Sequence, residues 1–275
     1  MDGPNSKVGK GRIVIRVDRP YLLIVGCPRS GTTLLASMIG CHTRVGMLNE
    51  DVSGKWMNKI LGKPIAANKL CIPNQVQMKR GTAFSRRLFK KLGFIKEAPR
   101  SSFSLEEYLE VPTLKIIAII RDGNDAIASM MNRGGSTLKM GSNRWAMATD
   151  TIYELRSRYP DRVLVIAFEH LLSQPQASLN EICSFLEIAY EKEMLNGCRY
   201  NPRYPETELN GSKAYRARAQ RNHFQLAERF PSTYRKYEAL LNTAGKAVLR
   251  SPLLIFFLWE WGCDFDLLAL SSIIG

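Results

Sequence analysis

The sequence contains few of the residues that build metal sites and disulfide frameworks. Its 275 residues include three histidines and six cysteines, at positions 27, 41, 71, 183, 198 and 263. No C-x-x-C pair and no zinc-like Cys/His spacing occurs among them. Several of the cysteines lie inside apolar runs, which favours buried, reduced thiols over disulfides. Internal repeats and low-complexity segments are also lacking, so an ordinary globular domain is expected.

Long uninterrupted hydrophobic runs are lacking at both ends of the sequence. The first 11 residues are polar and glycine-rich, without the apolar segment of a signal peptide or anchor. This predicts a cytoplasmic protein, or one of the Golgi lumen if an N-terminal anchor has been removed. Residues 246–275 are largely apolar, but Glu260, Asp264 and Asp266 interrupt them, so no transmembrane span is expected. We favour a tail packed on the domain over membrane-surface contact or a dimer interface. The sequence does not indicate an oligomeric state.

Acidic residues are outnumbered by basic ones, 25 against 39, which gives a formal net charge of +14. Such a charge favours anionic partners: nucleotides, nucleic acid, acidic polysaccharide or an anionic membrane surface. Nucleic acid is not expected, because basic runs interleaved with aromatic residues and known binding modules are absent. Residues 76–105 hold eight Lys/Arg against one acid, and residues 203–236 hold eight against three. We expect each segment to be a solvated face or a cover over an anionic ligand.

Apolar runs alternate along the chain with helical patterns of apolar residues. The candidate strands are 13–17, 21–26, 45–48, 65–71, 114–120 and 162–168. The candidate helices are 32–40, 125–132, 143–159 and 177–186. This alternation predicts one α/β domain, P-loop-like, with three layers and a central, mostly parallel sheet flanked by helices. Its core is expected at about 20–245, with a basic, acceptor-side insertion at 76–105 and an apolar tail at 246–275.

The candidate strand 21–26 is followed by the loop Gly26-Cys27-Pro28-Arg29-Ser30-Gly31-Thr32-Thr33. The loop has the G-x-x-x-x-G frame of a P-loop, in which backbone N–H groups and a helix N-terminus bind an anion. Thr32 stands where the Walker lysine would be, and the cation is Arg29, inside the loop. ATP and GTP hydrolases need that lysine on their β and γ phosphates. The loop therefore indicates a different anionic ligand.

Together with a second motif, this loop resembles that of the sulfotransferases that use 3′-phosphoadenosine 5′-phosphosulfate (PAPS). P-R-S-G-T-T-L-L is similar to their 5′-phosphosulfate loop, which implies that the donor is bound by Pro28, Arg29, Ser30, Gly31, Thr32 and Thr33. In that family an arginine at the end of a buried strand and a serine eight residues later hold the 3′-phosphate. Here Arg121 closes L-K-I-I-A-I-I, and Ser129 follows eight positions on. The resemblance is closest to the tyrosylprotein and carbohydrate branch, over roughly residues 20–245.

The resemblance also implies roles for residues outside the two anion motifs. In the tyrosylprotein enzymes a glutamate 21 residues after the loop arginine is the general base, and that position is Glu50 here. Lys69, in the pair Asn68-Lys69, corresponds to a lysine near the transferring sulfuryl group. Ser212 and Lys213 are candidates for the loop that covers the adenosine. The alternative to a catalytic role for Glu50 is a structural place in the N-cap region of a helix. The alternative for Lys69 is that of an ordinary exposed lysine at a strand end.

Three further positions are interpreted structurally. Asp122 is expected to serve the N-terminus of the helix that follows it. His42 matches a position in the tyrosylprotein enzymes, but a helix-end histidine is the preferred interpretation. Phe168 replaces the tyrosine often found in the V-x-Y-E-x-L strand of the family, so any hydrogen bond from that hydroxyl is lost.

These motifs predict an enzyme that transfers a sulfuryl group from PAPS to an acceptor hydroxyl, with Glu50, Lys69 and Arg29 as catalytic residues and no metal. A carbohydrate or glycolipid is the preferred acceptor, ahead of a peptide tyrosine and a small metabolite; the basic segment 76–105 would suit an anionic saccharide or acidic peptide. The rival hypotheses are a P-loop nucleotide kinase or other phosphotransferase, and a non-catalytic polyanion-binding module. A degenerate sulfotransferase, which binds nucleotide without turnover, lies between them.

Overall fold

Five parallel strands form one sheet in the order β2-β3-β1-β4-β5. The computed structural model describes residues 19–54, 57–60, 62–79, 103–134, 136–198 and 224–244. The strands are β1 (Tyr21–Gly26), β2 (Val45–Asn49), β3 (Ile65–Cys71), β4 (Leu114–Ile120) and β5 (Val163–Ala167). Because β1 is the middle strand, the loop that follows it lies at the centre of the carboxyl edge of the sheet, where ligands of such folds bind.

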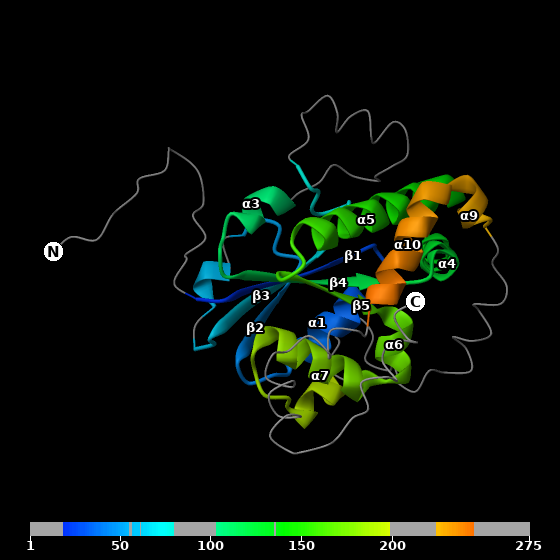
Figure 1. Ribbon diagram of the computed structural model, residues 1–275. Coiled ribbons are helices and arrows are strands. Elements are labelled where there is room, and N and C mark those ends of the chain that lie inside the picture. The colour runs from blue at the N-terminus through cyan, green and yellow to red at the C-terminus, as the bar shows by residue number, and fades with distance from the viewer. Residues whose placement is uncertain are drawn as a thin grey trace, which may run out of the picture.

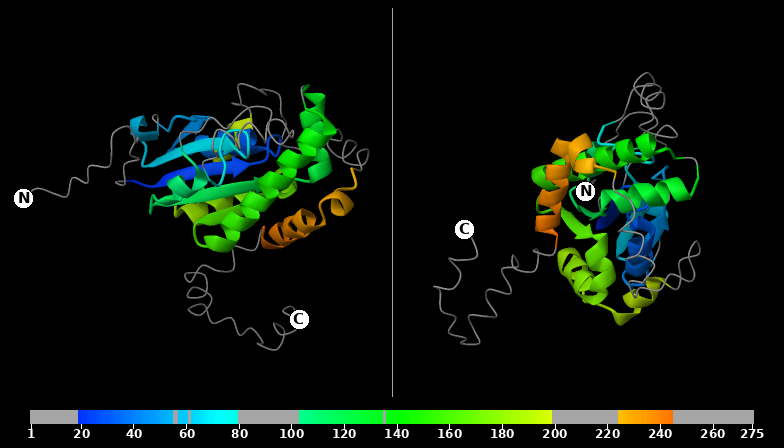
Figure 2. Two further views of the ribbon diagram at one scale, coloured as in Figure 1. Left: turned by 90° about the horizontal axis from the view of Figure 1, so that it is seen from above. Right: turned by 90° about the vertical axis from the view of Figure 1, so that its right-hand side faces the viewer.

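Helices cover both faces of this sheet (Figures 1 and 2). One face packs against α1 (Thr32–Gly40), α6 (Phe168–Ser173), α7 (Pro175–Leu186) and the 3-10 helix η2 (Lys192–Cys198). The other packs against α3 (Leu105–Leu109), α4 (Gly123–Asn132), α5 (Leu138–Arg158), α9 (Leu226–Arg229) and α10 (Pro231–Thr243). The short helix η1 (Met57–Lys59) adds Met57 to this second core. The predicted three-layer α/β fold is confirmed.

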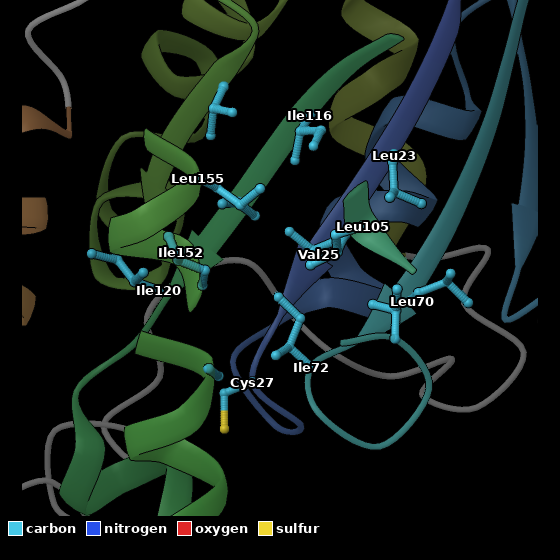
Figure 3. Packing of buried hydrophobic residues seen from close by; sticks show 14 of the residues in the cluster. Leu23, Val25, Cys27, Leu70, Ile72, Leu105, Ile116, Ile120, Ile152 and Leu155 are labelled. Carbon is cyan, nitrogen blue, oxygen red and sulfur yellow. The ribbon is translucent and has the colours of Figure 1, made fainter. Parts of the chain in front are cut away.

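The central strand β1 explains why both layers are needed, since all six of its residues are buried. Successive side chains of a strand point to opposite faces. Leu23, Val25 and Cys27 point into the core beneath α5 (Figure 3), whereas Leu22 and Ile24 point into the core beneath α1. A strand that is apolar on both faces is typical of a parallel sheet buried between helices.

The predicted elements that the structure describes match the observed ones within a few residues, whereas α3, α6, α9 and α10 were not predicted. The helix predicted at 143–159 begins at Leu138, because the hydroxyl of Thr137 accepts a hydrogen bond from Met140 N. The helix predicted at 125–132 begins at Gly123 for the same reason, with Asp122 as its cap. The predicted strand 13–17, the tail 246–275 and residues 80–102 of the basic segment lie outside the described residues. Among the helices of the described ranges, none is both long and apolar enough to cross a bilayer.

Candidate functional site

The loop between β1 and α1 has a backbone conformation suited to binding an anion. Arg29 and Gly31 have positive φ angles, 74° and 88°. Left-handed residues of this kind turn neighbouring N–H groups toward one side, which forms an anion-binding concavity. Ser30 N donates to Cys27 O (3.1 Å), and Leu35 N donates to Gly31 O (3.0 Å) as α1 begins. The N-terminus of α1 therefore follows directly on a loop that curls over the end of β1.

Gly31 is required both for its left-handed backbone and for its lack of a side chain. A Cβ atom at this position would lie 2.3 Å from Cδ2 of Phe168. We expect Gly31→Ala to lower the free energy of unfolding by about 2–4 kcal/mol, from the strained backbone and the overpacking together. The measurement is equilibrium unfolding in urea. Gly134→Ala is the matched control, since Gly134 has a φ of 81° but a Cβ added there would meet nothing within 4 Å; it should lose only about 1 kcal/mol. Equal losses in the two variants would contradict the steric explanation.

The predicted 3′-phosphate pair, Arg121 and Ser129, meets the loop through Arg29. Arg121 Nη1 donates to Arg29 O (2.9 Å), and Arg29 Nε donates to Ser129 Oγ (3.0 Å). Arg121 Nη2 also lies 3.5 Å from Asp125 Oδ2, one turn along α4. The arginine follows the last residue of β4, and the serine lies on α4, as the spacing of eight residues predicts. Two motifs that are about 100 residues apart in sequence thus form one continuous set of contacts.

Phe168 has a part in this arrangement that the sequence did not reveal. The guanidinium carbon of Arg121 lies 4.6 Å from the centroid of its ring, a distance at which a cation is attracted to the ring face. The same ring fills the space beside Gly31. Phe168 therefore supports both Arg121 and the loop, although it lacks the hydroxyl of the tyrosine expected at this place.

Glu50 and Lys69 form a salt bridge at the carboxyl ends of β2 and β3. Lys69 Nζ lies 2.6 Å from Glu50 Oε1, and the two side chains are 1% and 24% exposed. Glu50 N donates to Lys69 O (3.0 Å), and Glu50 has a φ of 67°. Within the described ranges no helix begins at Glu50, so the alternative interpretation of Glu50 as part of an N-cap region is wrong. The interpretation of Lys69 as an ordinary exposed lysine is wrong as well, because the side chain is buried.

Asn68 fixes the backbone around this ion pair. Its Oδ1 accepts hydrogen bonds from Asp51 N (3.2 Å) and Lys69 N (2.9 Å), and its Nδ2 donates to Asp51 O (2.8 Å). The buried amide thereby ties the turn after β2 to the end of β3. The sequence offered only the pairing of Asn68 with Lys69; the contact with Asp51 depends on strand order, which spacing alone does not give.

Asp122 and Trp145 hold the backbone of Arg121 in place. Asp122 Oδ1 accepts a hydrogen bond from Asp125 N (3.1 Å), which confirms it as the cap of α4. Its own N–H donates to Glu169 Oε1 (3.0 Å). Trp145 Nε1 donates to Arg121 O (3.4 Å). Three elements, α4, α5 and α6, therefore converge on the end of β4.

His42 is structural, as preferred from the sequence. The ring is 1% exposed. Its Nε2 lies 2.8 Å from Ala189 O, and its Nδ1 accepts from Arg44 N (3.0 Å). Both nitrogens are thus engaged with backbone groups, away from the residues described above.

Some of the predicted positions are not placed, and one residue was missed. Ser212 and Lys213 lie outside the described residues. Cys27 and Cys183 are buried free thiols, as expected, whereas Cys41 and Cys71 are only half-buried. No group of three or more His, Cys, Asp or Glu side chains that could hold a metal ion occurs within the described ranges.

The residue that sequence reasoning missed is Arg144, a buried charge of α5. Its signal in the sequence was a basic residue directly before Trp145 in an apolar helical pattern.

Comparison with known proteins identifies relatives of this chain. Residues 66–192 match the model of the sulfotransferase family. The protein-tyrosine sulfotransferase of Drosophila melanogaster is 23% identical over 206 residues, which is 65% of this chain and 40% of the relative. Protein-tyrosine sulfotransferase 1 of Danio rerio is 25% identical over 199 residues, 65% of this chain and 56% of the relative. The chain thus spans about half the length of the curated relatives it matches.

A solved structure supports the assignment of the fold. Mouse sulfotransferase SULT7A1, crystallised in complex with PAP, superposes with a TM-score of 0.50 at 17% identity over 80% of this chain and 84% of that one. The family match extends from β3 into η2, and it therefore includes Lys69, Arg121 and Ser129. Over residues 66–192 the chain is thus similar to the sulfotransferase family, and the loop of residues 26–33 lies at the adjoining end of β1.

Proposed function

We propose that the protein transfers a sulfuryl group from PAPS to a hydroxyl group of an acceptor. The observation that carries this proposal is the contact between the two anion motifs at one edge of the sheet. Arg29, from the loop, lies between Arg121 and Ser129. A donor with a phosphosulfate at one end and a phosphate on its ribose needs two anion-binding sites that lie as close to each other as these two motifs do. A nucleoside triphosphate carries no 3′-phosphate, and a lysine at the Walker position is absent.

The residues present fit such a donor at both ends. The backbone N–H groups of Gly31 to Thr33 and the N-terminus of α1 would bind the 5′-phosphosulfate, together with Arg29. Arg121 and Ser129 would bind the 3′-phosphate, because a guanidinium pairs well with phosphate oxygens. Ser212 and Lys213 are proposed to cover the adenosine.

Glu50, Lys69 and Arg29 would perform the chemistry of an in-line displacement at sulfur. The acceptor oxygen forms a bond to sulfur while the bond from sulfur to the bridging oxygen of the donor breaks, and adenosine 3′,5′-bisphosphate leaves with that electron pair. Glu50 takes the proton of the acceptor hydroxyl. Lys69 and Arg29 stabilise the negative charge that develops on the bridging oxygen. Most of the remaining rate enhancement would come from positioning the two reactants next to each other at one edge of the sheet.

Two observations bear on the acceptor, and they favour different hydroxyl-bearing molecules. The basic segment 76–105 would suit an anionic saccharide or an acidic peptide, and a carbohydrate or glycolipid is the acceptor preferred from the sequence. The relatives are by name protein-tyrosine sulfotransferases, which favours a tyrosine. A test panel therefore needs glycans, glycolipids and tyrosine peptides, each in charged and neutral forms.

The test is an assay with PAPS that carries a radiolabelled sulfuryl group, against pooled acceptors, with and without EDTA. We expect labelled product in both conditions. Absence of product, together with absence of PAPS and bisphosphate binding, would refute the proposal. Loss of product in EDTA would favour a metal-dependent phosphotransferase. A polyanion-binding module would instead show salt-sensitive binding that survives replacement of Glu50 or Lys69.

A further inference from the structure

Arg144 is a buried arginine whose charge the described part of the protein leaves largely uncompensated. It lies on α5 and is 3% exposed. Its Nη1 donates to Ser136 Oγ (2.9 Å), a neutral acceptor. Its Nε and Nη2 atoms are buried and have no hydrogen-bond partner among the described residues. Buried charges are ordinarily paired and hydrogen-bonded, because desolvation is otherwise costly.

No carboxylate of the described residues forms a salt bridge with this guanidinium, whereas Arg121 and Lys69 each have one. Burial lowers the pKa of Arg144, the direction expected when a cation is taken out of water without a counter-charge. The N–H groups of Nε and Nη2 lie on one side of the planar guanidinium, where they can donate to two oxygens of a carboxylate, sulfate or phosphate group.

The position of Arg144 connects it with the loop that follows β1. Burial is the main influence on Cys27 and raises the pKa of its thiol, Cys71 raises it further, and the charge of Arg144 lowers it. Arg144 is therefore within electrostatic range of the loop. Cys27 points from the end of β1 into the core beneath α5 (Figure 3). The next residue of α5, Trp145, binds the carbonyl of Arg121. Arg144 thus lies near both anion motifs, on the α5 side of the sheet.

We propose that Arg144 is an anion-binding residue of the active site, which pairs with an oxyanion of a bound reactant beside Cys27. This rests on the proposed function, since the reactants are the donor and an acidic acceptor. The oxyanion belongs either to the phosphosulfate end of PAPS or to an acidic group of the acceptor, and the two sources share one chemistry. Arg144 adds a cation from α5 to the cations of the loop and of β4.

The first test separates this role from a structural one in the ligand-free protein. Removal of an unpaired buried charge does not weaken a fold, whereas removal of a charge that binds backbone carbonyls does. Arg144→Met should leave the melting temperature unchanged or raise it. Arg156→Met is the control on the same helix, because Arg156 Nη1 donates to Val163 O (2.7 Å) and to Pro160 O; this variant should melt several degrees lower. A comparable fall in Arg144→Met would assign Arg144 to the fold and overturn the proposal.

The second test measures the binding of PAPS and of PAP, the bisphosphate without the sulfuryl group, by calorimetry. Loss of a charge-assisted contact should weaken binding about 10- to 100-fold in Arg144→Met, and Arg144→Lys should restore part of it. Weaker binding of PAPS alone assigns the contact to the sulfuryl group, and weaker binding of both ligands assigns it to a phosphate that they share. Unchanged binding of both, with a tenfold lower kcat/KM for an acidic acceptor but not for its neutral analogue, assigns it to the acceptor.

The role of Arg144 would be overturned if Arg144→Met changed the affinities for PAPS and PAP and the kcat/KM for an acidic acceptor by less than twofold. A wild-type protein that binds neither PAPS nor PAP would refute the proposed function instead. In that case the increase in melting temperature on addition of inorganic sulfate still tests Arg144. The increase should be smaller in Arg144→Met than in the wild type and in Arg156→Met, and an equal increase in all three would count against anion binding.

Discussion

Glu50→Gln should lower kcat by about 10²- to 10⁴-fold, the range typical for loss of a general base, while PAP binding changes less than about twofold. The amide keeps the shape of the carboxylate but cannot accept the proton of the acceptor hydroxyl. Glu50 lies at the ends of β2 and β3, whereas the anion motifs follow β1 and β4, so nucleotide affinity should be largely independent of it. The measurements are initial rates with saturating PAPS and calorimetric titration with PAP.

The neighbouring carboxylate gives a control for this prediction. Asp51 Oδ1 accepts hydrogen bonds from Ser53 N (3.0 Å) and Ser53 Oγ (2.6 Å), and so stabilises the turn after β2. Asp51→Asn should therefore retain turnover within about tenfold of the wild type, since it removes a charge from the same turn without removing the base. Full turnover in Glu50→Gln would show that another group takes the proton.

Arg121→Ala should weaken the binding of PAP by about 10- to 150-fold, the range for hydrogen bonds to a charged group. The guanidinium is held between Phe168, Asp125 and the carbonyl of Arg29, and is therefore pre-organised for a 3′-phosphate. The loss should be much smaller for AMP, which carries only the 5′-phosphate. The measurement is the ratio of the two dissociation constants, in wild type and variant.

This ratio distinguishes recognition of the 3′-phosphate from collapse of the loop. Arg121 also donates to Arg29 O, so its removal disturbs the loop and weakens any ligand bound there. Such a disturbance would affect PAP and AMP alike and leave their ratio unchanged. Arg121→Lys retains the charge without the planar donor group, so its ratio of dissociation constants should lie between those of the wild type and Arg121→Ala. An unchanged ratio in Arg121→Ala would remove the assignment of the 3′-phosphate to this residue.

The local features of this fold could be predicted from the sequence. The run 21–26 is apolar throughout and ends at a glycine, which identifies a buried strand followed by a tight loop. Arg121 and Ser129 were identified through the resemblance to the sulfotransferases, and their spacing fits a strand end and the helix that follows it. The positions of Glu50 and Lys69 followed from the resemblance to known sulfotransferases, but their salt bridge depends on the pairing of β2 with β3.

The remaining contacts join residues that are far apart in sequence, and no local pattern specifies them. Phe168 reaches both Gly31 and Arg121 because β5 lies beside β4 in the sheet. Arg144 appeared in the sequence as one more basic residue of a helix. It differs from the others in its surroundings, since it is buried and no carboxylate of the described residues pairs with it.

The order of the strands divides the candidate site into two halves. The β1–β4 half carries the loop, Arg121 and Ser129, and the β2–β3 half carries Glu50 and Lys69. The boundary between them lies between β3 and β1, and β1 is buried throughout. If the proposed roles hold, we expect substitutions beyond the ends of β2 and β3 to alter acceptor preference more than donor binding. For protein engineering, this makes the β2–β3 edge the place to build libraries of new acceptor specificity.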